Sequence, residues 1–235
     1  SDADLVFLDL EDSVAPSEKE SARKNVIRAL NDLDWGKKTR AVRINNLTTH
    51  WSHRDIIDVV EQAGENLDII IIPKVMSGKD VWWVDVLLTQ LEERLGLKKK
   101  IGLEVLIEEV EAMINAEEIA NASPRLEALI FGPGDYSASQ GVDTKSIGGE
   151  NGYPGDIWHY ARNKVIIAAR AAGIDMVDGP YAGIKNPEGY REECRRSRIL
   201  GAVGKWAIHP SQIEIANAEY SPSQEAVDKA RKLAA

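Results

Sequence analysis

The chain has 235 residues, of which 43% are hydrophobic and 29% are charged, the composition of an ordinary globular domain. Its formal net charge of -9 argues against nucleic acid or an anionic membrane as a partner. No apolar run reaches the roughly 20 residues of a membrane-spanning helix, and a single cysteine, Cys194, excludes an intramolecular disulfide and is typical of the reducing cytoplasm.

Short apolar segments alternate with amphipathic segments along the whole chain. This alternation predicts strands at residues 5–10, 40–45, 68–73, 101–107, 126–131, 176–179 and 205–209. Helices are predicted between them at residues 17–31, 52–64, 79–95, 109–121, 156–172 and 187–200, and a last helix begins near Ser223. A Gly-rich loop is expected to follow the fifth strand.

Strictly alternating strands and helices predict a parallel sheet covered by helices. We interpret residues 1–235 as a single catalytic domain with the α/β fold of a (β/α)8 TIM barrel. Such a barrel has eight strands, whereas this sequence shows about seven and begins within a strand. We therefore expect the first strand of the barrel to be missing from this chain. A doubly wound open sheet is the alternative, but no G-x-G-x-x-G motif or P-loop follows the first strand.

Nearly every predicted strand ends in polar residues. In a TIM barrel, the carboxyl ends of the strands meet at one rim, and this rim carries the active site. The polar strand ends are Asp9 to Asp12, Arg43 to Asn45, Pro73-Lys74, Glu108, Gly132 to Asp135, Asp178 and His209. So many polar ends at one rim predict an active site there.

Glu108 and Asp135 are the candidate metal ligands. Glu104 lies on the same face of its strand as Glu108, but ~13 Å along the strand separate them, so Glu104 is expected to serve the barrel interior through a hydrogen bond or a buried ion pair. Asp135 follows a Gly-Pro-Gly turn that lets the main chain approach a ligand. Two carboxylates without a neighbouring histidine or cysteine favour Mg²⁺, with Mn²⁺ as the second choice. The alternatives are a helix-dipole role for Glu108 and a turn or cap role for Asp135.

Arg43 stands in an apolar strand, where a charged group needs a partner. An anionic substrate oxygen is one candidate, and a fixed carboxylate from Asp9, Glu11 or Asp12 is the other. Arg43 can also contact both kinds of partner at the same time. His209, at another strand end, is either catalytic or simply held in place by hydrogen bonds.

These residues lie in segments that resemble the citrate lyase β-subunit and malyl-CoA lyase family, an HpcH/HpaI aldolase-like group. The similar segments follow one another in family order over essentially the whole chain: residues 8–14 (LDLEDSV), 42–45 (VRIN), 72–75 (IPKV), 106–108 (LIE), 115–120 (NAEEIA), 131–135 (FGPGD) and 204–213 (GKWAIHPSQI). Residues 146–149, 156–159 and 178–180 resemble the L-malyl-CoA/β-methylmalyl-CoA lyase branch more than citrate lyase itself.

The resemblance implies the roles of the main site residues. Glu108 and Asp135 correspond to the Mg²⁺ ligands of the family, and Arg43 corresponds to its catalytic, substrate-binding arginine. The main chain at Gly134 and Asp135 is expected to hold the carboxylate of the keto acid.

Further positions follow from the same resemblance. Asp9, Glu11 and Asp12 are expected to line the metal and substrate site. As our own hypothesis beyond the resemblance, Glu11 and Asp12 are candidate catalytic residues, with Asp12 as the candidate general base. Ala218 and Glu219 are expected to line the entrance for the acyl-CoA.

The activity implied is the reversible cleavage of malyl-CoA or β-methylmalyl-CoA, both CoA thioesters, to glyoxylate and acetyl-CoA or propionyl-CoA. The alternatives are a citrate lyase β-like or citramalyl-CoA lyase subunit, and a pyruvate-type metal aldolase that does not use CoA. In the family, a C-terminal lid completes the site of a neighbouring subunit. That lid is expected to be absent from this chain, and we expect a homo-oligomer, either a trimer or a hexamer.

Overall fold

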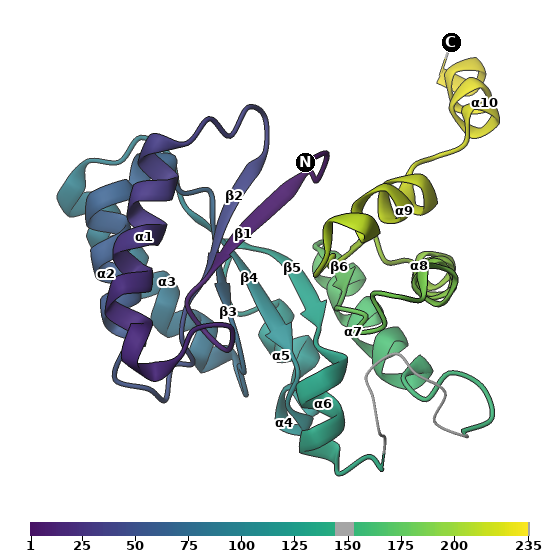
Figure 1. Cartoon of the computed structure of the whole chain (residues 1–235), viewed down its shortest axis with the longest axis horizontal. Coiled ribbons are helices and arrows are strands. Elements are labelled where there is room, and N and C mark those ends of the chain that lie inside the picture. Colours follow the sequence, from purple (N-terminus) through teal and green to yellow (C-terminus); the bar gives the residue numbers. More distant parts are fainter. Residues whose placement is uncertain (144–152, 235) are drawn as a thin grey trace.

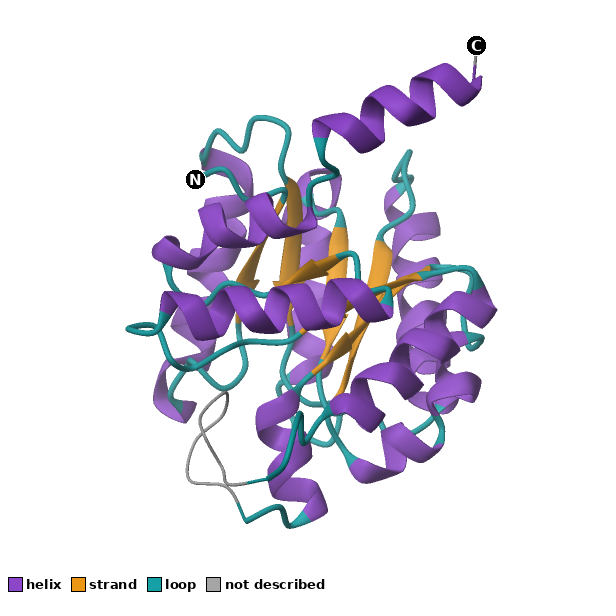
Figure 2. Cartoon of the chain, turned by 90° about the vertical axis from the view of Figure 1, so that its right-hand side faces the viewer, coloured by secondary structure: helices purple, strands orange, loops and turns teal. Residues whose placement is uncertain are grey.

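The computed structural model describes residues 1–143 and 153–234. Its framework is one parallel sheet of seven strands that lie side by side in chain order. The strands are β1 (Leu5–Asp9), β2 (Thr39–Arg43), β3 (Ile69–Ile72), β4 (Gly102–Ile107), β5 (Leu126–Phe131), β6 (Asp175–Asp178) and β7 (Gly204–Lys205). Helices surround the curled sheet on its outer side (Figures 1 and 2). This is a TIM-barrel fold, as the sequence predicted.

The helices follow the strands in regular alternation. They are α1 (Lys19–Asp32), α2 (Ser52–Ala63), α3 (Gly78–Leu95), α4 (Val110–Ile114), α5 (Ala116–Ala120), α6 (Pro133–Gln140), α7 (His159–Ala172), α8 (Pro187–Leu200), α9 (Pro210–Tyr220) and α10 (Gln224–Ala234), with short 3-10 helices at Pro16–Glu18 and Gly64–Asn66. None of the helices in the described ranges is both long and apolar enough to cross a bilayer. Residues 146–149, one of the segments resembling malyl-CoA lyases, lie outside the described residues.

Four features of the structure differ from the predicted elements. The predicted helix at 109–121 is divided at Asn115 into α4 and α5. Helix α6 begins at Pro133, in the segment expected to be a loop, and α9 begins at Pro210, before the expected last helix. A proline favours the first helical turn, because its missing N–H would have no partner there. The predicted strand 205–209 is reduced to the two residues of β7.

The four isoleucines of β3 show how the sheet divides the core. Ile69 and Ile71 belong to the apolar cluster of the barrel interior, whereas Ile70 and Ile72 belong to the larger core between sheet and helices. All four are buried, so the strand is apolar on both faces, as expected for a parallel strand with covered faces. Each buried side chain contributes roughly 1.5–3 kcal/mol of hydrophobic stabilisation.

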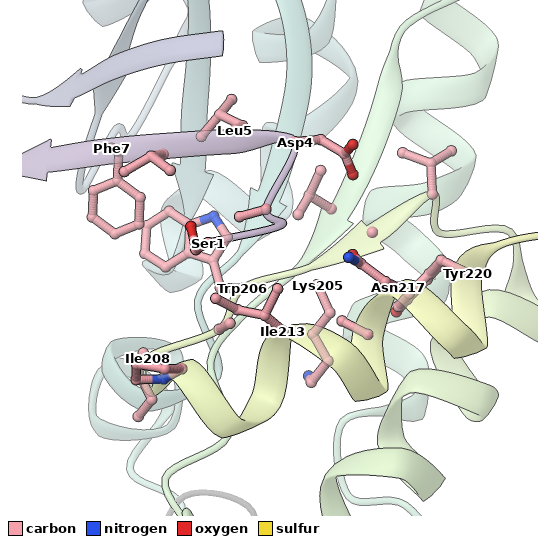
Figure 3. A pocket seen from close by; sticks show the side chains of 18 of the residues that line it. Ser1, Asp4, Leu5, Phe7, Lys205, Trp206, Ile208, Ile213, Asn217 and Tyr220 are labelled. Carbon is pink, nitrogen blue, oxygen red and sulfur yellow. The ribbon is translucent and has the colours of Figure 1, made fainter. Parts of the chain in front are cut away.

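β1 and β7 are the two edges of the sheet, and they do not pair with each other within the described residues. A cavity of about 880 Å³ lies between β1 and the segment that runs from β7 through α9 (Figure 3). The rings of Phe7 and Trp206 approach to 4.5 Å between their centroids beside this cavity. Seven strands with two open edges agree with a barrel that has one strand fewer than eight.

Glu104 of β4 lines this cavity and is only 7% exposed. It makes no hydrogen bond or ion pair within the described residues, which corrects the expectation of a hydrogen-bonded or paired group. Burial, assisted by the negative charge of Glu127, raises the pKa of Glu104 to about 7. The carboxyl group is tolerated there because it can take up a proton.

Candidate active site

Arg43 and Asp9 lie opposite each other in the register of β1 and β2. The guanidinium donates from Nε to Oδ1 of Asp9 at 2.8 Å and from Nη2 to Oδ2 at 2.7 Å. Its Nη1 also lies 3.0 Å from Oε2 of Glu11. Burial would raise the pKa of Asp9, but the hydrogen bonds and charge of Arg43 lower that pKa to about 2. Arg43 thus has fixed carboxylate partners.

Two aromatic rings flank Arg43. Its guanidinium carbon lies 5.8 Å from the ring centre of Phe7 and 5.7 Å from that of Trp206. Cations are attracted to aromatic faces at such distances. Together with the carboxylate contacts, the rings fix the orientation of the guanidinium. Among the described residues, two of its five N–H groups donate hydrogen bonds, both to Asp9, which leaves the others available to a substrate.

Lys74 lies at the centre of the cluster, directly after β3 and Pro73. Its ammonium contacts Oε1 of Glu11 at 2.5 Å, Oδ2 of Asp12 at 3.0 Å and Oδ2 of Asp135 at 2.9 Å. The sequence identified Lys74 only as a polar strand end in the segment IPKV. The structure adds that all three ammonium donors face carboxylates.

Glu108 follows β4 and is buried at the same rim. Its Oε1 accepts a hydrogen bond from the main-chain N–H of Lys74 at 2.9 Å. Its Oε2 lies against Gly132, where a side chain would not fit. Burial raises the pKa of Glu108 to about 8, although the positive charge of Lys74 opposes this rise.

Asp135 stands in the first turn of α6, after β5, with a side chain that is 41% exposed. The main-chain N–H groups of Gly134 and Asp135 have no acceptor within the described residues, as is usual in the first turn of a helix. Such N–H groups can bind an anion. The structure therefore brings both carboxylates to Lys74, Glu108 to its main-chain N–H and Asp135 to its ammonium, and leaves two main-chain donors beside Asp135.

The carboxylate oxygens of this cluster are suitable ligands for a hard cation. Oε2 of Glu108 and Oδ1 of Asp135 accept no hydrogen bond in the described part of the chain. Carboxylate oxygens are the ligands that Mg²⁺ prefers, and the ion usually keeps several waters. No group of three or more His, Cys, Asp or Glu residues among the described residues is arranged to hold a metal. Glu108 and Asp135 would each offer one oxygen to such an ion, and water and substrate would supply the other ligands.

Three other predicted residues lie elsewhere. Glu219 of α9 pairs with Arg191 at 3.0 Å and Arg195 at 3.1 Å, both on α8, and the neighbouring Ala218 is exposed. The ring of His209 accepts a hydrogen bond at the start of α9, which is the role of a helix cap. The expectation that Ala218 and Glu219 line the acyl-CoA entrance stays a prediction.

Asp178, another polar strand end, lies in a buried ion cluster. Its Oδ2 accepts from Nζ of Lys205 at 2.7 Å, and its Oδ1 accepts from Nε of Arg162 at 3.0 Å. Glu193 contacts the same two cations at 3.0 Å and 3.3 Å. The side chains of Asp178, Arg162 and Lys205 are fully buried, so this cluster joins β6 and β7 to α7 and α8.

Comparison with known proteins gives concordant matches. The profile of a family described as HpcH/HpaI aldolase/citrate lyase matches residues 1–210. The whole chain is 49% identical to an L-malyl-CoA/β-methylmalyl-CoA lyase of Cereibacter sphaeroides and covers 77% of it. A malyl-CoA/β-methylmalyl-CoA/citramalyl-CoA lyase of Chloroflexus aurantiacus is 34% identical over 98% of this chain and 71% of its own. The CitE protein of Mycobacterium tuberculosis, solved with magnesium, acetoacetate and coenzyme A, gives a TM-score of 0.77 at 28% identity over 98% of this chain and 78% of that chain.

Proposed function

The chain belongs to the HpcH/HpaI aldolase/citrate lyase family, and we propose that it is a carbon–carbon lyase that reversibly cleaves malyl-CoA or β-methylmalyl-CoA. The products are glyoxylate and acetyl-CoA or propionyl-CoA. The identity of 49% over the whole chain to a lyase named for these two substrates carries the proposal.

We assign a divalent cation, Mg²⁺ or in its place Mn²⁺, to Glu108 and Asp135. Two observations support this assignment. Each carboxylate has one oxygen that accepts no hydrogen bond among the described residues, and the similar Mycobacterium tuberculosis protein was solved in complex with magnesium. When bound, the ion supplies a Lewis acid that polarises the oxygens of the substrate.

The substrate carboxylate is assigned to the main-chain N–H groups of Gly134 and Asp135. The start of α6 carries partial positive charge, which favours an anion there. We propose that Arg43 stabilises the negative charge that develops during cleavage. Its planar guanidinium is held by Asp9 and Glu11 and still has N–H donors that can reach a substrate. A donor fixed in this way needs little reorganisation when the charge appears.

Asp12 is our candidate for the general base. Its side chain is 63% exposed at the rim and shares the Lys74 ammonium with Glu11, which is only 5% exposed. In the cleavage direction, Asp12 takes the proton of the substrate hydroxyl, and the C2–C3 bond breaks. The hydroxyl carbon becomes the carbonyl of glyoxylate, and the bonding electrons form the enolate of the thioester, which is then protonated. Glu11, the second catalytic candidate, helps to hold Arg43 and Lys74.

We also propose a cytoplasmic homo-oligomer, a trimer or a hexamer, in which residues 1–235 form one catalytic domain. Trp82 and Trp83 of α3 are 59% and 39% exposed, and α10 has no buried residue and extends away from the body (Figure 1). Exposed apolar surface of this kind is typical of interfaces between chains. Light scattering of the purified protein would measure the number of subunits.

A substrate panel tests the proposed activity against the alternatives. The purified chain is given Mg²⁺ and, separately, malyl-CoA, β-methylmalyl-CoA, citramalyl-CoA and a CoA-free 4-hydroxy-2-oxo acid. We expect efficient cleavage of the first two without any partner protein. Preference for citramalyl-CoA, or a need for a partner, would favour the subunit alternative. Cleavage of the CoA-free acid alone would favour a pyruvate-type aldolase.

A further inference from the structure

Lys74 holds both carboxylates that we assign to the metal, one through its main chain and one through its side chain. The main-chain N–H donates to Oε1 of Glu108 at 2.9 Å, and the ammonium lies 2.9 Å from Oδ2 of Asp135. In each carboxylate one oxygen is thus engaged, and the other accepts no hydrogen bond among the described residues.

The backbone at Lys74 is unusual. Its φ of 51° is the one positive value for a residue other than glycine in the described part of the chain. This left-handed conformation is unfavourable for a residue with a side chain. Residues held in such conformations are concentrated at functional sites, where the surrounding contacts outweigh the cost. Here those contacts are the Glu108 hydrogen bond and the ion pairs of the ammonium.

The buried Glu11 fixes the position of the ammonium, and Asp12 adds a second contact. They contact Nζ of Lys74 at 2.5 Å and 3.0 Å, and Glu11 is in turn tied to Arg43. The ammonium is therefore fixed from the side of β1 and can serve as a rigid support for Asp135, whose own side chain is exposed enough to adopt other rotamers.

We propose that Lys74 is the positioning residue of the metal site: it engages one oxygen of Glu108 and one of Asp135 and thereby presents their other oxygens to the divalent cation. Outer partners that orient metal-binding groups in this way typically change metal affinity by about 10–100-fold. The inference rests on the proposed assignment of the metal to Glu108 and Asp135.

The test is the dissociation constant for Mg²⁺, measured by titration calorimetry on the purified protein. Lys74→Met removes the ammonium and keeps most of the length of the side chain, and we expect it to bind Mg²⁺ at least about tenfold more weakly than wild type. Lys74→Arg should restore part of the affinity. Lys99→Met removes a lysine that pairs with Asp68 instead, and its affinity should equal that of wild type.

A second variant guards against a folding defect. Lys74→Gly accepts the left-handed conformation without strain and retains the N–H that holds Glu108. It should bind Mg²⁺ as weakly as Lys74→Met, because both lack the support for Asp135. Wild-type affinity in both variants would refute the positioning role, and tighter binding would show instead that the ammonium competes with the ion. If wild type itself binds no Mg²⁺, the metal assignment fails, and the role of Lys74 fails with it.

Discussion

Gly132 and Glu108 are packed so closely that a methyl group on Gly132 would lie 2.6 Å from Oε2 of Glu108 and 2.7 Å from its Cβ. Neither distance is compatible with an unmoved Glu108. The glycine that follows β5 therefore sets the position of a carboxylate that follows β4.

Gly132→Ala should displace Glu108 and weaken Mg²⁺ binding by at least about tenfold, since even a modest shift of a metal ligand disturbs the coordination. Calorimetric titration with Mg²⁺ measures this. Gly204→Ala is the matched control, because the nearest atom to its new methyl group would be 4.0 Å away. Equal affinities for the two variants would mean that Oε2 of Glu108 is not a metal ligand.

Arg43→Lys should retain the fold, because a lysine can still pair with Asp9, but lose the planar contact to Asp9 and Glu11. We expect kcat/KM for malyl-CoA to fall by roughly 10²–10³-fold, the usual cost of removing a donor that stabilises developing charge. Steady-state kinetics give the loss, and circular dichroism checks the fold. Wild-type kinetics would make Arg43 a structural residue only.

Glu104 should make the protein less stable as the pH rises. Its pKa is about 7 in the folded chain and 4.5 in a model compound, so between these values the folded state holds a proton that the unfolded state releases. The free energy of unfolding should thus fall by up to roughly 3 kcal/mol between pH 4.5 and 7 and then level off. Urea titrations measure this free energy across the pH range. Relative to wild type, the free energy of unfolding of Glu104→Gln should increase by a corresponding amount as the pH rises from 4.5 to 7.

The exposed Glu93 provides the control for that experiment, because Glu93→Gln should follow the pH dependence of wild type. If the difference in free energy of unfolding between Glu104→Gln and wild type is the same at pH 4.5 and at pH 8, burial does not raise the pKa of Glu104.

Lys205→Met should destabilise the protein by about 3–5 kcal/mol, because it leaves the buried Asp178 and Glu193 short of one cation. Lys99→Met, which breaks an ion pair at a partly exposed lysine, should cost less than about 1 kcal/mol. Urea unfolding of the two variants measures both values. Similar small losses would show that Arg162 alone neutralises the cluster.

Much of the fold could be predicted where the pattern is local. The boundaries of β5 (Leu126–Phe131) and α8 (Pro187–Leu200) agree with the prediction, because an apolar run marks the strand and Asn186-Pro187 and Gly201 mark the ends of the helix. Helix α6 was missed because Gly132 and Gly134 suggested a loop, although Pro133 is a suitable first residue of a helix. The length of β7 depends on pairing with β6, which no local pattern reveals.

The site was predictable as a set of residues but not as an arrangement. The strand ends predicted that Arg43, Glu108 and Asp135 lie at one rim. The left-handed backbone of Lys74 and its contacts with Asp135 and Glu108 arise from packing between distant segments, so a sequence reading could not supply them. Glu104 was expected to have a partner, and the absence of one among the described residues depends on which side chains share the barrel interior.

The most direct measurement of the proposed function is the product balance of malyl-CoA cleavage. The purified protein is incubated with malyl-CoA and Mg²⁺, and glyoxylate, acetyl-CoA, malate and free CoA are quantified by mass spectrometry. We expect glyoxylate and acetyl-CoA in equal amounts, no product in the presence of EDTA, and almost none from Glu108→Gln. Malate and free CoA in place of these products, or cleavage that continues undiminished in EDTA, would contradict a metal-dependent carbon–carbon lyase.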